Sequence, residues 1–161
     1  MKTQPIKRSD ELKVLSREHH FGLLFAWKVR EGLKLNVETS RLNAYVNHFW
    51  EDHLKNHFLN EEVLLFNMIN DPLCIQAKND HIAIITQIEK INSFGKDDPN
   101  AYTKLAEILS NHIRFEERIA FPHLEEKLSE AKLHGISLFL EKDYNEEFIN
   151  EYEDEFWIKK K

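Results

Sequence analysis

The feature that most constrains this chain is a His-x-x-x-Glu pair that occurs twice, each time inside a segment with helical apolar spacing. The first copy is His57 with Glu61, and the second is His112 with Glu116. Residues four apart lie on one face of a helix, with Cβ atoms ~6 Å apart. A buried carboxylate without a partner is strongly destabilising. A helical fold that turns both pairs inward must therefore supply cationic partners, and a metal ion is one such partner.

The composition favours long helices. The 161 residues include only four glycines and four prolines, so the chain has few of the residues that end helices. Hydrophobic residues make up 42% of the chain and charged residues 31%, which is ordinary for a globular protein. This length is enough to bury one core, and we expect a single domain over residues 1–161.

Four segments have the apolar periodicity of long amphipathic helices. They run from about 11 to 33, 39 to 70, 72 to 93 and 99 to 128. Asp71-Pro72 and Asp98-Pro99 mark two helix starts, because proline fits the first helical turn and disfavours a helical predecessor. Short connections place neighbours antiparallel, so we expect an all-α, up-down four-helix bundle over about residues 9–128. Residues 129–161 should add short C-terminal helices, with Tyr152 to Trp157 packing over the bundle in preference to forming a dimer contact.

The interior faces of these helices also carry histidines. On a helical wheel His19 falls in the apolar stripe of the first helix and His20 points to its polar side, although a one-residue error would exchange the two. His81 replaces an aliphatic residue in the stripe of the third helix. The helical spacing also places many apolar residues inside, among them Leu15, Phe49 and Leu105 as well as Leu23, Met68 and Ile119.

Six inward polar residues form the expected metal site: His19, His57, Glu61, His81, His112 and Glu116. A lone histidine on an apolar face is usually a hydrogen-bonded core residue, and a lone His-x-x-x-Glu is usually a surface pair. Four histidines at similar depth, one per helix, with two carboxylates at matching offsets, favour a site for two divalent ions. Both carboxylates would bridge, and each ion would take two imidazoles. Mixed nitrogen and oxygen ligands suit iron, with manganese and zinc as alternatives.

The residues next to these six are expected to play supporting roles. His53, one turn before His57, fits a seventh ligand, a pocket gate or a hydrogen-bond partner of a ligand, and we favour the last. Phe58 and Phe115 are expected to form a small apolar pocket beside the ions. Three further acids are expected to be exposed neighbours and not ligands: Glu18, Glu62 and Glu117.

These segments together resemble the hemerythrin-like, or HHE cation-binding, family. The matching motifs are Leu15 to His20, His57 to Glu62, Asp80-His81 and His112 to Glu117. The resemblance implies a four-helix bundle that holds two iron ions joined by an oxo or hydroxo bridge, with His19 or His20 and the five other inward residues as ligands. Oxygen-carrying hemerythrins have a His-x-x-x-His pair on the third helix, whereas Ala77 and Ile85 flank His81 here. The ligand set is closer to bacterial relatives linked with iron–sulfur repair, nitric oxide handling or sensing.

We therefore expect a protein that binds dioxygen, nitric oxide or peroxide at two irons for sensing, buffering or iron handling. The alternative is a di-metal oxidoreductase that scavenges peroxide; a helical interaction protein without metal is a weaker third. The net charge of −6 and the absence of a basic stripe argue against a nucleic-acid partner. No uncharged run approaches the ~18 residues of a membrane span, and the single cysteine fits a reducing compartment. A cytoplasmic monomer or homodimer is the expectation.

Overall fold

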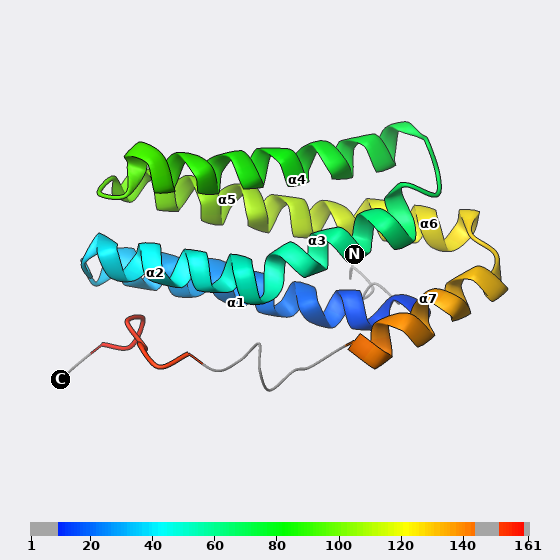
Figure 1. Ribbon diagram of the computed structural model, residues 1–161, viewed down its shortest axis with the longest axis horizontal. Helices are drawn as coiled ribbons and strands as arrows, with labels where there is room; N and C mark the ends of the chain where they lie inside the picture. The colour runs from blue at the N-terminus through cyan, green and yellow to red at the C-terminus, as the bar shows by residue number, and fades with distance from the viewer. Residues whose placement is uncertain (1–9, 144–151, 160–161) are drawn as a thin grey trace, which may run out of the picture.

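A computed structural model describes residues 10–143 and 152–159 of the chain (Figure 1). This part of the protein is helical and contains no strand. After a short 3-10 turn at Asp10–Leu12, the α-helices are α1 (Lys13–Lys34), α2 (Thr39–Phe49), α3 (Lys55–Glu61), α4 (Pro72–Lys90), α5 (Pro99–Phe115), α6 (Phe121–Lys127) and α7 (Glu130–Asp143). Within these ranges, no helix is both long and apolar enough to cross a membrane.

The helices contain four π-helical turns: η2 (Trp50–Leu54), η3 (Glu62–Phe66), η4 (Ile91–Gly95) and η5 (Glu116–Ala120). Of these, η2 joins α2 directly to α3 and η5 joins α5 directly to α6, while η3 and η4 end helical segments before a loop. Each turn fits extra backbone into the helix and changes the direction in which later side chains point. Figure 1 shows the resulting bend between α2 and α3. Thus α2 to η3 forms one long helical rod, and α5 to α6 forms another. Together with α1 and α4 they are the four rods of the bundle.

The starts of two helices follow from their sequences. Asp71 precedes α4 and accepts a hydrogen bond from the backbone N–H of Cys74 at 3.0 Å, while Pro72 occupies the first helical position. Asp98 and Pro99 repeat this arrangement at α5. The turn between α1 and α2 contains Asn36 at φ 55°, a left-handed conformation that asparagine tolerates better than most residues.

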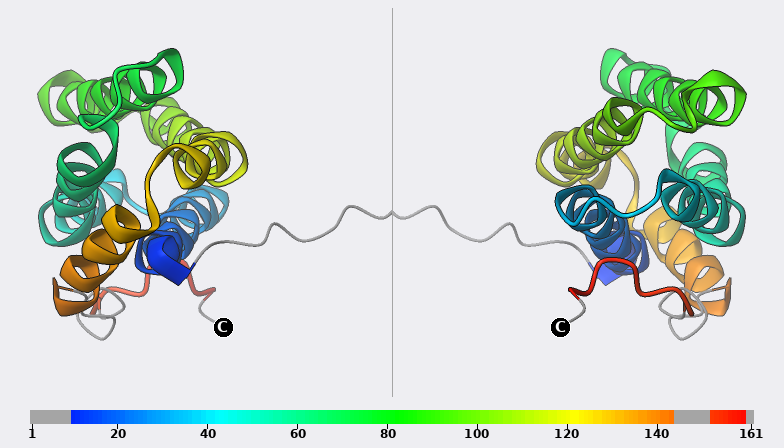
Figure 2. Two further views of the ribbon diagram at one scale, coloured as in Figure 1. Left: turned by 90° about the vertical axis from the view of Figure 1, so that its right-hand side faces the viewer. Right: turned by 90° about the vertical axis from the view of Figure 1, so that its left-hand side faces the viewer.

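The rods pack as an antiparallel four-helix bundle, which Figure 2 shows from its two ends. Helix α5 packs against both α1 and α4, and α7 crosses the end of the bundle against α1. The predicted all-α bundle with an additional C-terminal helix is confirmed. The expected helix boundaries at 39, 72 and 99 coincide with the starts of α2, α4 and α5.

Two apolar clusters form the core of the bundle. One includes Phe25, Phe49 and Leu105, and the other includes Leu15, Leu65 and Phe121. On each of the four rods the buried histidines and glutamates lie near the boundary between the two clusters. The polar layer therefore has apolar packing both above and below it.

Three residues expected in the core are exposed: Leu23 at 38%, Met68 at 48% and Ile119 at 49%. Ile119 lies within η5 and Met68 follows η3, so the π turns rotate both away from the face that a regular 100° wheel assigns them. Leu23 lies in a regular helix, one step beside the interior line through Gly22 and Ala26. The core predictions for these three residues were wrong.

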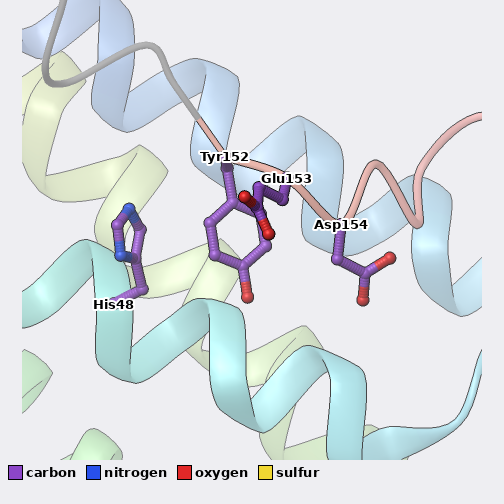
Figure 3. A pocket seen from close by; sticks show the side chains of 4 residues that line it. All are labelled: His48, Tyr152, Glu153 and Asp154. Carbon is purple, nitrogen blue, oxygen red and sulfur yellow. The ribbon is translucent and has the colours of Figure 1, made fainter.

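The last described segment, residues 152–159, packs on the bundle without forming a regular helix. Phe156 is 2% exposed within the first cluster, and Arg41 on α2 donates a hydrogen bond to Asp154 at 2.9 Å. Tyr152, Glu153 and Asp154 line a shallow surface hollow together with His48 (Figure 3). Residues 144–151, part of the C-terminal region expected to form short helices, lie outside the described part of the chain.

Candidate metal centre

The six polar residues expected to face inward lie together at the middle of the bundle. His19 comes from α1, His57 and Glu61 from α3, and His81 from α4, while His112 and Glu116 come from the α5–η5 rod. Each of the four imidazoles is at most 3% exposed, and both carboxylates are fully buried. All four rods of the bundle thus contribute to one buried polar layer.

These side chains form two groups that share both carboxylates. One group is His19, His57, Glu61 and Glu116, and the other is Glu61, His81, His112 and Glu116. Within each group one donor atom per residue lies within 4.8 Å of all the others. The arrangement is that of two adjacent cation sites, each with two imidazoles, joined by two carboxylates.

The two oxygens of Glu61 face different imidazoles. Its Oε2 lies 3.2 Å from Nε2 of both His19 and His57, whereas its Oε1 lies 3.0 Å from Nε2 of His81. Oε1 of Glu116 lies 2.5 Å from Nε2 of His112 and 3.5 Å from Nε2 of His19. Two donors at right angles on one ion, each ~2.1 Å from it, are ~3 Å apart. The observed separations are of this size.

The outer nitrogen of every histidine in the layer contacts a further carboxylate. Nδ1 of His57 is 3.1 Å from Glu18 and Nδ1 of His81 is 2.9 Å from Glu62, both as hydrogen bonds. The remaining two are a hydrogen bond between His112 and Asp80 at 3.0 Å and a contact of 3.2 Å between His19 and Glu117, which does not meet hydrogen-bond geometry. A carboxylate at Nδ1 holds the proton there and turns the Nε2 lone pair inward. All four imidazoles therefore present Nε2 to the shared carboxylates.

Electrostatics in this layer favour positive charge. Burial alone lowers the pKa of His57, but the carboxylates of Glu61 and Glu18 outweigh it and raise the pKa to about 9. Burial is likewise outweighed at His112, where Glu116 and Asp80 raise the pKa to about 10. For Glu61, burial acts to raise the pKa, yet the adjacent histidines hold it well below its usual value. The carboxylates thus attract cations, whether protons or metal ions.

Some atoms at the centre of the layer have no aligned hydrogen-bond partner among the described residues. They are Nε2 of His112 and both carboxylate oxygens of Glu116, all buried. Such groups are rare because leaving one unsatisfied costs about 1–3 kcal/mol. Metal ions accept lone pairs from these atoms without hydrogen-bond geometry. The donor set, nitrogen and oxygen without sulfur, fits first-row divalent ions such as iron, manganese and zinc.

A narrow internal cavity adjoins one side of the layer. Its lining includes His19, His57 and His112 together with apolar groups such as Leu109 and Ile113. The cavity has no space wide enough for a water molecule. Gly22 of α1 also borders it, and a Cβ there would come within 2.7 Å of the Ile113 side chain. Side chains would have to move before even a small molecule could enter this space.

Four residues near the six central ones differ in where they lie. His20 is exposed, whereas His19 faces the layer. His53 is buried, but it is not part of either donor group. Phe58 lines the internal cavity and stacks on His81 with ring centroids 3.9 Å apart. Phe115 does not line that cavity; it borders a separate surface hollow between α4 and α5, beside Asp80 and His112.

Sequence reasoning missed the carboxylates that contact the outer nitrogens. Glu18, expected to be exposed, is 8% exposed, and Glu62 and Glu117 are partly buried. The placement of Asp80 directly before His81 gave no sign that it contacts His112 on the next rod. One usable signal was that four of the six central residues have an acid directly beside them in the sequence: His19, Glu61, His81 and Glu116.

Comparison with known proteins gives one match. The family model of the hemerythrin HHE cation binding domain matches residues 10–124, which include all six residues of the two donor groups. Searches of curated proteins and of solved structures gave no significant match.

Proposed function

Because the chain belongs to the hemerythrin HHE cation-binding family, we propose that it is a non-haem di-iron protein that binds dioxygen, nitric oxide or peroxide. The role that suits such binding is sensing, buffering or iron handling. Bound iron would supply redox-active centres with coordination positions open to a small ligand. The rest of the proposal concerns what the residues of this chain do.

One observation carries the proposal: four buried imidazoles point Nε2 at the same two carboxylates, and each has a further carboxylate at Nδ1. Histidines that bind metals in proteins almost always have such a partner on the outer nitrogen. With the imidazoles neutral, the fully buried carboxylates of Glu61 and Glu116 would balance half of the charge of two divalent ions.

The number of protein donors supports ligand binding at the ions. Each group supplies two imidazole nitrogens and two carboxylates, which is fewer donors than the six positions that iron commonly uses. The third-helix position four residues before His81 is Ala77, which is fully buried and has no donor atom. Open positions are therefore expected for both ions.

The internal cavity supports a small ligand in particular. Its lining combines apolar residues, including Phe58, Leu109 and Ile113, with histidines of the metal layer, and it is too narrow for bulk water or larger substrates. Dioxygen and nitric oxide are small and apolar, so entering this cavity costs them little desolvation. The cavity is a poor fit for a metabolite with several polar groups.

The experiment that tests this function starts from protein loaded anaerobically with ferrous iron. We expect addition of nitric oxide or dioxygen to change the absorption spectrum with saturation at a fixed ratio to protein, and removal of nitric oxide under argon to reverse it. Glu61→Gln should abolish the response, and Glu51→Gln on the same rod, 63% exposed, should retain it. Catalytic consumption of hydrogen peroxide over many equivalents would favour the enzymatic alternative, and the absence of any ligand response would refute both.

A further inference from the structure

His53 is a buried polar residue beside the metal centre that the donor groups do not use. It lies in η2, is 4% exposed and lines the internal cavity. Its Nε2 is buried and has no hydrogen-bond partner among the described residues. An unsatisfied buried nitrogen costs about 1–3 kcal/mol, so its retention calls for an explanation.

The tautomer of His53 follows from its other nitrogen. The imidazole makes a hydrogen bond with the backbone of Glu18, and because Nε2 has no partner, this bond is made by Nδ1. A backbone group that favours the protonated ring is a carbonyl, so Nδ1–H donates to the carbonyl oxygen of Glu18. Nε2 is then left with a lone pair and no proton.

The ring of His53 is held in place by aromatic neighbours. Its centroid is 4.8 Å from that of Phe49 and 6.3 Å from that of Phe21. It also stacks on His57, with centroids 5.8 Å apart and an interplanar angle of 24°. Together with the Glu18 bond these contacts fix the direction of Nε2. A group fixed before binding loses little entropy when a ligand arrives.

We propose that His53 is a specificity-determining residue that accepts a hydrogen bond from the ligand in the cavity and so favours ligands that carry a proton over aprotic ones. Hydrogen peroxide is such a protic ligand, whereas azide and nitric oxide have no proton to donate. The inference rests on the proposed di-iron function. The other polar groups that line the cavity already have partners: His19, His57 and His112 face the shared carboxylates, and Glu18 contacts Nδ1 of His57.

The test uses the full chain loaded with iron and oxidised, with hydrogen peroxide and azide as probes. His53→Leu removes the acceptor, and His53→Gln keeps one, in its amide oxygen. His48→Leu is the matched control, because this histidine is on the same rod, pairs with Asp52 at 2.8 Å and does not line the cavity. Iron per chain is measured first for every variant, and binding of each probe is then followed by its absorption change in rapid mixing.

We expect wild type, His53→Leu and His53→Gln to hold equal amounts of iron. His53→Leu should bind hydrogen peroxide about threefold to tenfold more weakly, the effect of losing one hydrogen bond, and azide no more weakly than wild type. His53→Gln should recover most of the peroxide affinity, and His48→Leu should match wild type with both probes.

Three results would overturn the inference. Loss of iron from His53→Leu alone would make His53 a metal ligand. Equal weakening of both probes would indicate a packing role, and unchanged peroxide binding would show that Nε2 makes no contact with the ligand. Wild-type protein that binds no iron would instead refute the di-iron proposal on which the inference rests.

Discussion

At the scale of single residues, each of the four central histidines has two different neighbours. Nε2 faces Glu61 or Glu116, and Nδ1 faces a separate carboxylate on another part of the bundle, as in the pair His112 and Asp80 at 3.0 Å. The inner atoms are where we propose iron binds. The outer carboxylates fix the tautomer and the ring orientation, so they should affect metal affinity without contacting metal.

The first prediction concerns one of these outer carboxylates. Asp80→Asn keeps the shape of the side chain but removes the charge that holds the Nδ1 proton of His112. We expect iron affinity to fall about 10-fold to 100-fold while the protein stays folded. Competition with a chelator of known affinity measures the change. Asp52→Asn, which removes the partner of His48 outside the site, is the control and should have no effect; equal losses in both variants would contradict the assigned role.

The second prediction concerns a shared carboxylate. Glu116→Gln removes one negative charge from both donor groups and should reduce bound iron to well below two per chain. Because Glu116 is the main cause of the raised pKa of His112, the same change should also remove the stability that protonated His112 gives the metal-free protein. Metal analysis and urea unfolding of the metal-free form measure the two effects. Full iron content in this variant would remove Glu116 from the site.

Residue identities at the centre could be predicted from sequence, but their outer partners could not. His57 and Glu61 share one helix, so their spacing alone predicts a common face. The contact between His57 and Glu18 joins different helices, and its existence depends on how α1 and α3 are rotated against each other. A helical wheel of one segment contains no information about that rotation.

At the scale of elements, the four rods were predictable and their π turns were not. Apolar periodicity and the Asp-Pro pairs gave the helix starts, because both signals are local. The π turns η2, η3 and η5 lie beside or within the segments that carry His53, Glu61 and Glu116, and their backbone shift has no clear sequence signature. This shift explains why Ile119 is exposed although its spacing from Phe115 places it inside.

The third prediction compares glycine-to-alanine substitutions at a closely packed position, Gly32 in α1, and at an open position, Gly135 in α7. Alanine is favoured over glycine in helices by about 1 kcal/mol. At Gly32, however, a Cβ would meet Leu42 at 2.9 Å and the Phe156 ring at 3.0 Å, so overpacking of about 1–3 kcal/mol should make Gly32→Ala destabilising. Gly135 in α7 has nothing within 4 Å, so Gly135→Ala should stabilise. Urea unfolding of both variants measures the signs, and stabilisation by Gly32→Ala would show that the C-terminal segment does not pack there.

At the scale of the whole molecule, the buried polar layer ties folding to cation binding. Without metal, the charges of Glu61 and Glu116 at the centre of the bundle must be balanced by protons on the surrounding histidines. With metal, the ions take over this role and the imidazoles must be neutral. Protons and metal ions therefore compete for the same layer, and the two forms of the protein should respond to pH in opposite ways.

The fourth prediction follows from this competition. In the metal-free protein the pKa values of His57 and His112 are raised to about 9 and about 10, against about 6.5 in an unfolded chain. Their contribution to stability is complete below pH ~6.5 and is lost as the pH rises through the folded values. The free energy of unfolding of chelator-treated protein should therefore fall between pH ~6.5 and ~10, whereas iron affinity should rise over the lower part of this range. Stability that stays constant or rises with pH would contradict the account.

The central claim is that two ions occupy the layer between the two apolar clusters. The most direct measurement is iron content of the full chain after anaerobic loading and desalting, together with its absorption spectrum before and after reduction. We predict about two irons per chain, with near-ultraviolet charge-transfer bands of a coupled ferric pair that disappear on reduction. A folded helical protein that retains no iron, manganese or zinc under these conditions would contradict the claim, and the buried histidines and carboxylates would then need another explanation.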